Sequence, residues 1–187
     1  MPLHLACPAP LLARGFATHE ERPAHLPALR ALLRRQRWDD FAMLPWDDAA
    51  KAALIDQQFD AQHRHYAGAH PEVLFLVLLD EGQGRVAGRI CLAADQAGDI
   101  RLLDILLSPE DRRQGLGTAL IGALLDQAAA EGRRVLLEVA KGNPAAGLYR
   151  RLGFHAVGDT GIGWHMACTA APMLAWKAPL PLSVPIP

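Results

Sequence analysis

The chain has 187 residues, enough for one domain of ordinary size and too few for two independent enzymatic domains. Apolar residues make up 51% of the sequence and charged residues 21%, which predicts a packed core and excludes a disordered, collagen-like or disulfide-framework protein. The formal charge is -1, from 19 basic and 20 acidic side chains, so neither nucleic acid nor an acidic membrane has an electrostatic basis as the main partner. A small molecule or a peptide is the expected ligand.

The cysteines and the apolar runs bear on cellular location. Cys7, Cys91 and Cys168 are odd in number and far apart, as expected of reduced thiols. The first basic residue is Arg14, and three prolines precede it, which is unlike a secretory signal peptide. The longest apolar runs, such as residues 73–79, are far too short to cross a bilayer. We therefore expect a soluble, cytoplasmic protein with no membrane partner.

The first third of the chain is expected to hold one strand and two helices. Residues 11–18 have a strand-like pattern, and residues 20–37 carry leucines at helical spacing. A second helix is expected over 49–66, ending before Gly68, because the acidic residues Asp47 and Asp48 suit the positive end of a helix dipole.

The middle of the chain alternates apolar runs with turn residues. The expected elements are a hairpin with strands at 73–79 and 85–94, a strand at 100–107, a helix at 115–131 and a strand at 134–140. Gly132 is placed to end the helix in the left-handed conformation that glycine tolerates.

A second, shorter helix has clear limits. Asn143 supplies a capping oxygen, and Pro144 suits the first helical position, where no N–H is needed. Gly153 is placed to end this helix.

The remaining residues complete the expected architecture. Two final strands are expected at 154–157 and 162–168, whereas residues 171–187 hold five prolines and no periodic pattern. We expect one mixed α/β domain over residues 1–170, followed by a proline-rich extension.

The stretch 107–118 has the features of an anion site, because a buried strand passes through a short loop into a helix opened by glycines. The first N–H groups of a helix have no partner within it, and the helix dipole places about half a positive charge there. Gly115 and Gly117 leave room for phosphate oxygens near the backbone, and Arg112 and Arg113 add positive charge at the rim. A solvated helix cap is the alternative interpretation.

Two common phosphate sites are excluded by spacing. The Gly115-Leu-Gly117 sequence lacks the third glycine of a Rossmann motif, and seven residues separate the strand from Gly115 where a tight turn is required. No Lys-Ser/Thr pair follows the glycines, so the loop is not a P-loop.

Together with residues 143–154, this stretch resembles the GNAT superfamily of acyl-CoA-dependent N-acetyltransferases. The Arg112-x-x-Gly115-x-Gly117 pattern matches the family element that binds the pyrophosphate of CoA. The close match covers about residues 100–157, and residues 1–70 match only in outline. The resemblance implies a central, mixed, mostly antiparallel sheet of about six to seven strands, flanked by helices and splayed between the fourth and fifth strands.

The resemblance also implies a cosubstrate and a route for the reaction. Acetyl-CoA is expected to donate its acetyl group directly to a primary amine in a ternary complex, with no metal. The backbone at the end of the 100–107 strand is expected to pair with the pantetheine arm, and an N–H there to polarise the acetyl carbonyl. The residues assigned to acetyl-CoA are Ile105, Leu106, Leu107, Arg112, Arg113, Gln114, Gly115, Leu116, Gly117, Thr118 and Asn143.

Tyr149 and Glu138 are the candidate catalytic residues. Tyr149 is expected to face the sheet, where its hydroxyl assists the departing thiolate; a tyrosine that merely packs its ring is the alternative. Glu138 stands in an apolar strand and matches the Leu-Glu-Val base of bacterial relatives that acetylate a ribosomal protein, whereas a solvent-facing or arginine-paired glutamate remains open. Other relatives carry a glutamate base on the preceding strand, where this chain has only Arg101 and Asp104 as charged residues.

Other features leave the acceptor open. His63, His65 and His70 lack a nearby carboxylate or cysteine, so we expect surface positions rather than metal ligands. The acidic residues between 39 and 48 alternate with tryptophans, which suits either an entrance for a cationic amine or a solvated helix cap. The acceptor is expected to be a small molecule or a peptide, and homodimerisation stays open. A non-catalytic acyl-CoA-binding module and a nucleotide-binding domain are the alternative functions.

Overall fold

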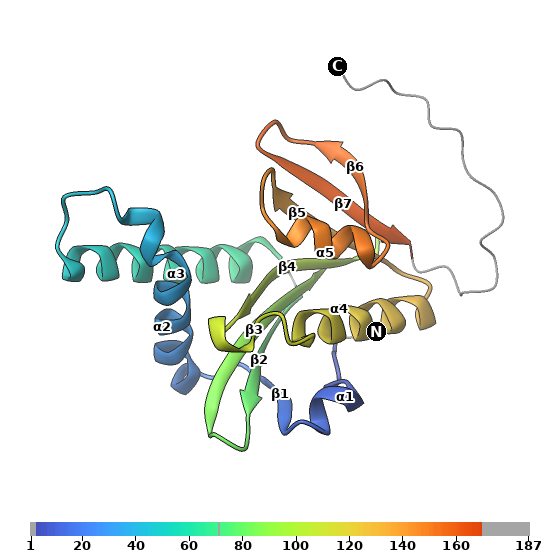
Figure 1. Cartoon of the computed structure of the whole chain (residues 1–187). Coiled ribbons are helices and arrows are strands. Elements are labelled where there is room, and N and C mark those ends of the chain that lie inside the picture. Colours follow the sequence, from blue (N-terminus) through green and yellow to red (C-terminus); the bar gives the residue numbers. More distant parts are fainter. Residues whose placement is uncertain (1–2, 71, 170–187) are drawn as a thin grey trace.

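A computed structural model of the protein describes residues 3–70 and 72–169, so the expected extension at 171–187 lies outside the described residues. Figure 1 shows the elements in chain order. They are α1 (Ala9–Leu12), β1 (Phe16–Glu20), α2 (Leu26–Arg37), α3 (Asp48–Ala69), β2 (Val73–Asp80), β3 (Arg85–Ala94), β4 (Ile100–Leu107), α4 (Leu116–Ala130), β5 (Arg134–Ala140), α5 (Ala145–Arg151), β6 (His155–Asp159) and β7 (Gly163–Thr169). Short 3-10 turns lie at Pro23–His25, Trp38–Phe41 and Pro109–Asp111.

The strands form one seven-stranded sheet in the order β1-β2-β3-β4-β5-β7-β6. Every neighbouring pair is antiparallel except β4 and β5, which run parallel. Their pairing is short, because it joins only Ile100, Arg101 and Leu102 to Val135, Leu136 and Leu137. Beyond these residues the strands separate, and β5, β7 and β6 turn away from β1–β4 (Figure 1). The predicted fold class, including the splay between the fourth and fifth strands, is confirmed.

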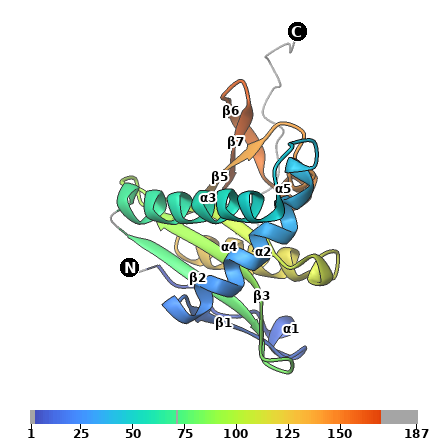
Figure 2. The same ribbon diagram turned by 90° about the vertical axis from the view of Figure 1, so that its left-hand side faces the viewer.

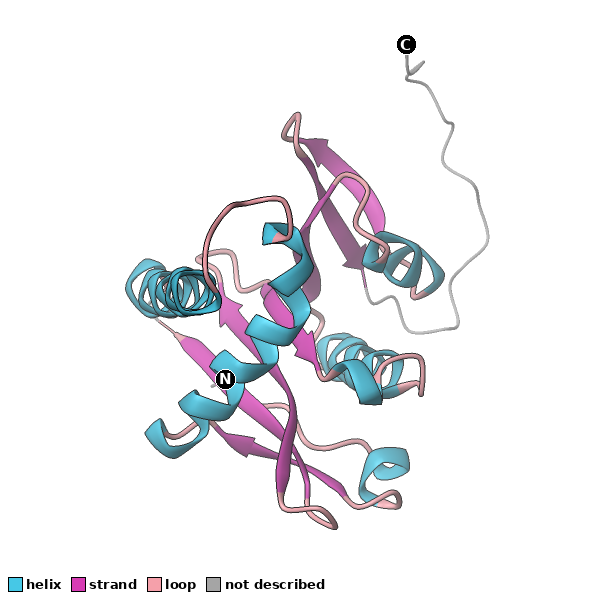
Figure 3. Cartoon of the chain, turned by 60° about the vertical axis from the view of Figure 1, so that its left-hand side comes forward, coloured by secondary structure: helices cyan, strands magenta, loops and turns pink. Residues whose placement is uncertain are grey.

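Helices cover both faces of the sheet, α2 and α3 on one and α1, α4 and α5 on the other (Figures 1 and 2). The larger core lies on the α4 side and includes Leu116, Leu120, Ile121 and Leu124 of α4. The smaller core lies under α2 and α3 and is built from Leu29, Leu32, Phe59, Val77 and Leu106. Figure 3 shows the same layers coloured by secondary structure.

The N-terminal segment differs from its expected structure. The predicted strand at 11–18 begins only at Phe16, because Pro10 lies in the first turn of the short helix α1 and Gly15 then turns the chain at a φ of 81°. The predicted helix at 20–37 begins at Leu26, after the turn that contains Pro23. Pro27 is tolerated because it lies in the first turn of α2, where no N–H is required.

Helix α3 is longer than expected and continues through Gly68 to Ala69. The expected end before Gly68 is therefore wrong: an exposed glycine near a helix end costs only about 1 kcal/mol relative to alanine, and the preceding turns offset this. The start of α3 agrees with its acidic pattern, because the carboxylate of Asp47 accepts the N–H of Ala50 at 2.7 Å.

Candidate functional site

The gap between β4 and β5 is lined by main-chain groups of β4. The N–H of Ser108 donates to the carbonyl of Ala87 on β3 at 2.8 Å. Because backbone groups alternate in direction along an antiparallel pair, the N–H and C=O groups of Leu107 and Ile105 face the gap, and those of Leu106 face β3. The structure thus presents two of the three predicted backbone positions to the gap.

A bulge in β4 lies where the gap opens. The register passes from Cys91 opposite Asp104 to Leu92 opposite Leu102, so Leu103 is the extra residue. Its carbonyl accepts the hydroxyl of Tyr66, on α3, at 3.0 Å. Burial, and then the charge of Asp104, raises the pKa of Tyr66, so this hydroxyl stays protonated and remains a donor. Sequence reasoning missed Tyr66, which carries no motif.

The start of α4 presents unpaired main-chain donors. Among the described residues, no acceptor is within hydrogen-bond reach of the N–H groups from Arg113 to Thr118. Gly115 precedes α4 with a φ of 84°, and Arg113 has a φ of 57°, so the loop adopts left-handed backbone twice within three residues. A β-carbon added at Gly117 would lie 3.5 Å from the side chain of Leu107 and 3.7 Å from that of Leu148. Unpaired main-chain donors at the start of a helix are an arrangement that suits an anion.

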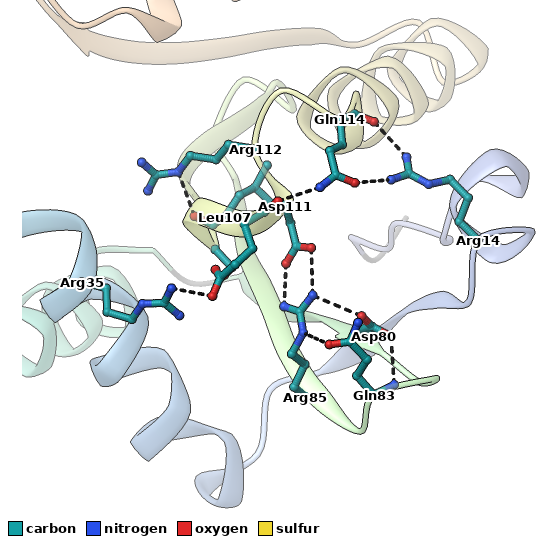
Figure 4. A network of polar contacts seen from close by, with 11 residues as sticks. Arg14, Arg35, Asp80, Gln83, Arg85, Leu107, Asp111, Arg112 and Gln114 are labelled. Atoms are coloured by element: carbon teal, nitrogen blue, oxygen red, sulfur yellow. Dashed lines mark hydrogen bonds and ion pairs between the residues drawn. The ribbon is translucent and has the colours of Figure 1, made fainter.

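Side chains of the same loop form hydrogen bonds to neighbouring parts of the chain (Figure 4). The side chain of Arg112 donates from Nε to the carbonyl of Leu107 at 3.1 Å and from Nη2 to Gln36 at 2.9 Å. Glu110 accepts from Ser108 and from Arg35 of α2, and these two hydrogen bonds lower its pKa to about 2. Glu110 and Arg112 thereby fasten the loop to α2.

Helix α5 places Tyr149 as predicted. The Oδ1 of Asn143 accepts the N–H of Ala145 at 2.9 Å, and Gly153 ends the helix with a φ of 93°. Tyr149 is buried, with its ring edge-on to Phe154 at 5.7 Å between centroids. Burial, followed by the charge of Asp104 on β4, raises the pKa of Tyr149, so the hydroxyl is protonated at neutral pH. Among the described residues it has no hydrogen-bond partner.

Comparison with known proteins decides the family. Residues 33–154 match the model of the acetyltransferase (GNAT) family. The chain belongs to the GNAT family. A search of curated proteins finds no match to it.

Solved GNAT structures share its fold. The PaiA N-acetyltransferase of Thermoplasma acidophilum, in complex with coenzyme A, is 17% identical with a TM-score of 0.60, over 82% of this chain and 98% of that one. The ribosomal-protein-S18-alanine N-acetyltransferase of Escherichia coli is 22% identical with a TM-score of 0.56, over 88% and 99%. A histone acetyltransferase HPA2 and related acetyltransferase of Corynebacterium glutamicum is 22% identical with a TM-score of 0.61, over 86% and 99%. The splayed sheet is thus a GNAT sheet.

Within this GNAT fold, Glu138 lies on the face of β5 opposite to Tyr149. Val135, Leu137 and Val139 are buried in the larger core, so strand alternation turns Glu138 to the other face. Its side chain is 57% exposed, and its charged neighbour is His165 of β7, whose Nδ1 lies 4.0 Å from Oε2. The structure therefore places Glu138 at the surface, with no arginine beside it among the described residues.

Asp104, by contrast, is held in place. The guanidinium of Arg89, only 1% exposed, lies 2.6 Å from the Asp104 carboxylate and stacks on Phe59 at 4.7 Å from the ring centroid. Two opposite charges inside the apolar strands β3 and β4 were the sequence signal for this pair, which sequence reasoning did not use.

His63 is partly buried beside residues of α3 and β2. His63 contradicts its expected surface position in part, because it pairs with Glu21 at 2.7 Å and stacks on Phe75 at 4.4 Å. Within residues 3–70 and 72–169, no group of three or more His, Cys, Asp or Glu side chains is arranged to hold a metal ion. No helix in that part of the chain is both long and apolar enough to cross a membrane.

Proposed function

We propose that the protein transfers an acetyl group from acetyl-CoA to a primary amine of a small-molecule or peptide acceptor, by direct attack in a ternary complex. One observation carries the proposal: the free N–H groups from Arg113 to Thr118 adjoin the β4 backbone that has no strand partner in the gap. Three free cysteines suit a reducing compartment, so we place the enzyme in the cytoplasm.

The residues present fit the donor molecule. The unpaired N–H groups at the start of α4 suit a diphosphate, since helix dipole and main-chain donors act together there. Arg113 adds positive charge at the rim, and Arg112 braces the loop. In this proposal the main-chain groups of Ile105 and Leu107 hold the pantetheine arm, and the N–H of Leu107 polarises the thioester carbonyl that acetyl-CoA supplies.

Two side chains then handle protons. Glu138, directly or through a water molecule, takes a proton from the attacking amine as the C–N bond forms. Tyr149 donates a hydrogen bond to the sulfur as the C–S bond breaks and negative charge develops there. Its raised pKa supports this role, because the hydroxyl keeps its proton at neutral pH.

The test is an acetyl-CoA consumption screen against small amines, antibiotics and peptides, followed by variants at saturating amine. Tyr149→Phe and Glu138→Gln are each expected to lower kcat by about 10²-fold or more, within the usual range for removing a general acid or base. Glu131→Gln, at the far end of α4, is the matched carboxylate control and keeps full activity. Unchanged thiol release in both variants refutes the catalytic assignments.

A non-catalytic acyl-CoA-binding module is the second candidate, favoured by the 57% exposure of Glu138 and its 4.0 Å separation from His165. It predicts a thermal shift with coenzyme A and no consumption of acetyl-CoA with any acceptor. A nucleotide-binding domain predicts saturable NAD or ATP binding without competition by coenzyme A.

A further inference from the structure

The loop between β4 and α4 contains a buried carboxylate that the proposed chemistry does not use. The side chain of Asp111 is 5% exposed, and both of its oxygens accept from Arg85, at 2.6 and 2.9 Å (Figure 4). Arg85 begins β3 and also reaches Asp80, at the end of β2, at 3.2 Å. The β2–β3 hairpin thus holds the loop through one bidentate ion pair, a geometry that fixes orientation as well as distance.

A second contact secures the residue just before Gly115. Arg14 donates from Nη1 to the main-chain carbonyl of Gln114 at 2.9 Å and from Nη2 to its side-chain oxygen at 3.1 Å. The Gln114 amide in turn donates to the carbonyl of Glu110 at 2.6 Å. Arg14 lies in the turn before β1, so a second segment outside the β2–β3 hairpin also holds the loop (Figure 4).

These contacts explain how the loop keeps its unusual backbone. Arg113 has a φ of 57°, which a non-glycine residue adopts only when the surroundings hold it there. Asp111 stands two residues before it, and Gln114 one residue after it. The left-handed residue Arg113 therefore lies between two residues that arginines from other elements hold in place.

We propose that Arg85 and Asp111 are positioning residues for the diphosphate of the acyl donor. The inference rests on the proposed function and deepens it: the pair touches no reacting atom, and it holds the loop in the conformation that aims the free N–H groups. Such contacts are made equally in the ground state and the transition state. Their loss is therefore expected to raise KM for acetyl-CoA and leave kcat unchanged.

The experiment compares a donor that has the diphosphate with one that lacks it. Arg85→Gln and Asp111→Asn are assayed with acetyl-CoA and with S-acetylpantetheine, and the Kd of coenzyme A is measured by calorimetry. We expect KM and Kd to rise about tenfold, the effect of losing one well-placed hydrogen bond, with kcat unchanged. The value of kcat/KM for S-acetylpantetheine is expected to match that of the wild type.

Asp99→Asn is the matched control. Asp99 is also a buried carboxylate that accepts two-pronged hydrogen bonds from an arginine, Arg134, but it precedes β4 rather than following it. This variant is expected to be less stable and to bind coenzyme A as tightly as the wild type does. If Asp111→Asn does not fold, Arg85→Lys takes its place in the test. Arg85 is 31% exposed, and lysine keeps the positive charge but cannot form the two parallel hydrogen bonds of the guanidinium.

Each outcome separates the two proposals. A wild-type protein that binds no coenzyme A overturns the proposed function. A wild-type protein that binds it, with variants that bind equally well, overturns the inference alone. Variants that lose activity with both donors by the same factor also overturn it, since the pair then acts only on the fold. The double variant is expected to lose as much affinity for coenzyme A as the single variant that binds it more weakly, because the two residues act as one unit.

Discussion

The hydroxyl of Tyr66 on α3 and the carbonyl of Leu103 on β4 are joined by a hydrogen bond of 3.0 Å at the point where the sheet divides. Leu102 is the last residue of β4 that pairs with β5, and Leu103 is the next residue and the bulge. The Tyr66 hydroxyl therefore donates to the first carbonyl of β4 beyond the residues that pair with β5. Because Asp104 adjoins Leu103, this bond also bears on the direction of the carboxylate that pairs with Arg89.

Tyr66→Phe removes this bond and leaves the ring in place. We expect the free energy of unfolding to fall by about 1–2 kcal/mol, because a half-buried carbonyl loses its partner. We also expect kcat to fall, since the bulge sets the course of the gap-facing backbone. Urea unfolding and steady-state kinetics measure the two effects. A variant with wild-type kcat would show that the bulge keeps its shape without Tyr66.

Gly88→Ala tests the close approach of β3 to the end of β4. A β-carbon there would lie 2.5 Å from the Leu106 carbonyl and 2.8 Å from the Leu107 side chain, so β4 has to move. We expect a loss of about 1–3 kcal/mol in unfolding free energy together with lower kcat/KM. Gly122→Ala is the control: nothing lies within 4 Å of the added carbon in α4, and a gain of about 0.5–1 kcal/mol is expected.

Gly115→Ala tests the left-handed residue at the start of α4. Its φ of 84° is strained for any residue with a β-carbon, so the loop is expected to shift and KM for acetyl-CoA to rise. Gly132→Ala removes an equivalent glycine, with a φ of 66°, at the opposite end of α4. The two variants should lose similar stability, about 1 kcal/mol, and only the first should change KM. Equal KM values would argue against the loop as the diphosphate site.

Stability is expected to depend on pH through Asp99. Hydrogen bonds from Arg134 lower the pKa of Asp99 below its ordinary value of 3.8. A carboxylate with a lowered folded-state pKa stabilises the protein above its unfolded-state pKa, and this contribution is lost as pH falls through the folded-state pKa. The wild type should exceed Asp99→Asn by about 1–2 kcal/mol near pH 7, and the difference should shrink below about pH 4. A difference independent of pH would contradict this assignment.

Much of the fold follows from local sequence. The strands β3, β4 and β5 begin and end at the predicted residues, because each is an apolar run of strand length bounded by turn residues or charges. The beginning of the chain follows less directly from its local sequence. The helix α1 spans four residues, too few for a periodic pattern, and β1 is defined by its pairing with β2 rather than by its own composition.

The candidate site also has parts that follow from local sequence and parts that do not. The local structure around the glycine loop and Tyr149 could be predicted, because each lies within a contiguous motif, and their roles stay predictions. Arg85 and Asp111 are 26 residues apart, Tyr66 and Leu103 are 37 apart, and Arg14 and Gln114 are 100 apart. Such partners depend on strand register and on a bulge, which no local pattern specifies.

Within the described sheet, β1–β4 are joined to β5, β6 and β7 by three residue pairs alone. Further connections between the two halves include the side chains packed beneath α4 and the ion pair of Asp99 with Arg134. A molecule bound in the gap would contact both halves and take the place of the strand pairing that is absent between β4 and β5 there. Amide hydrogen exchange is then expected to slow in β5 and β7 together with β4, so that part of the enzyme's rigidity comes from its own substrate.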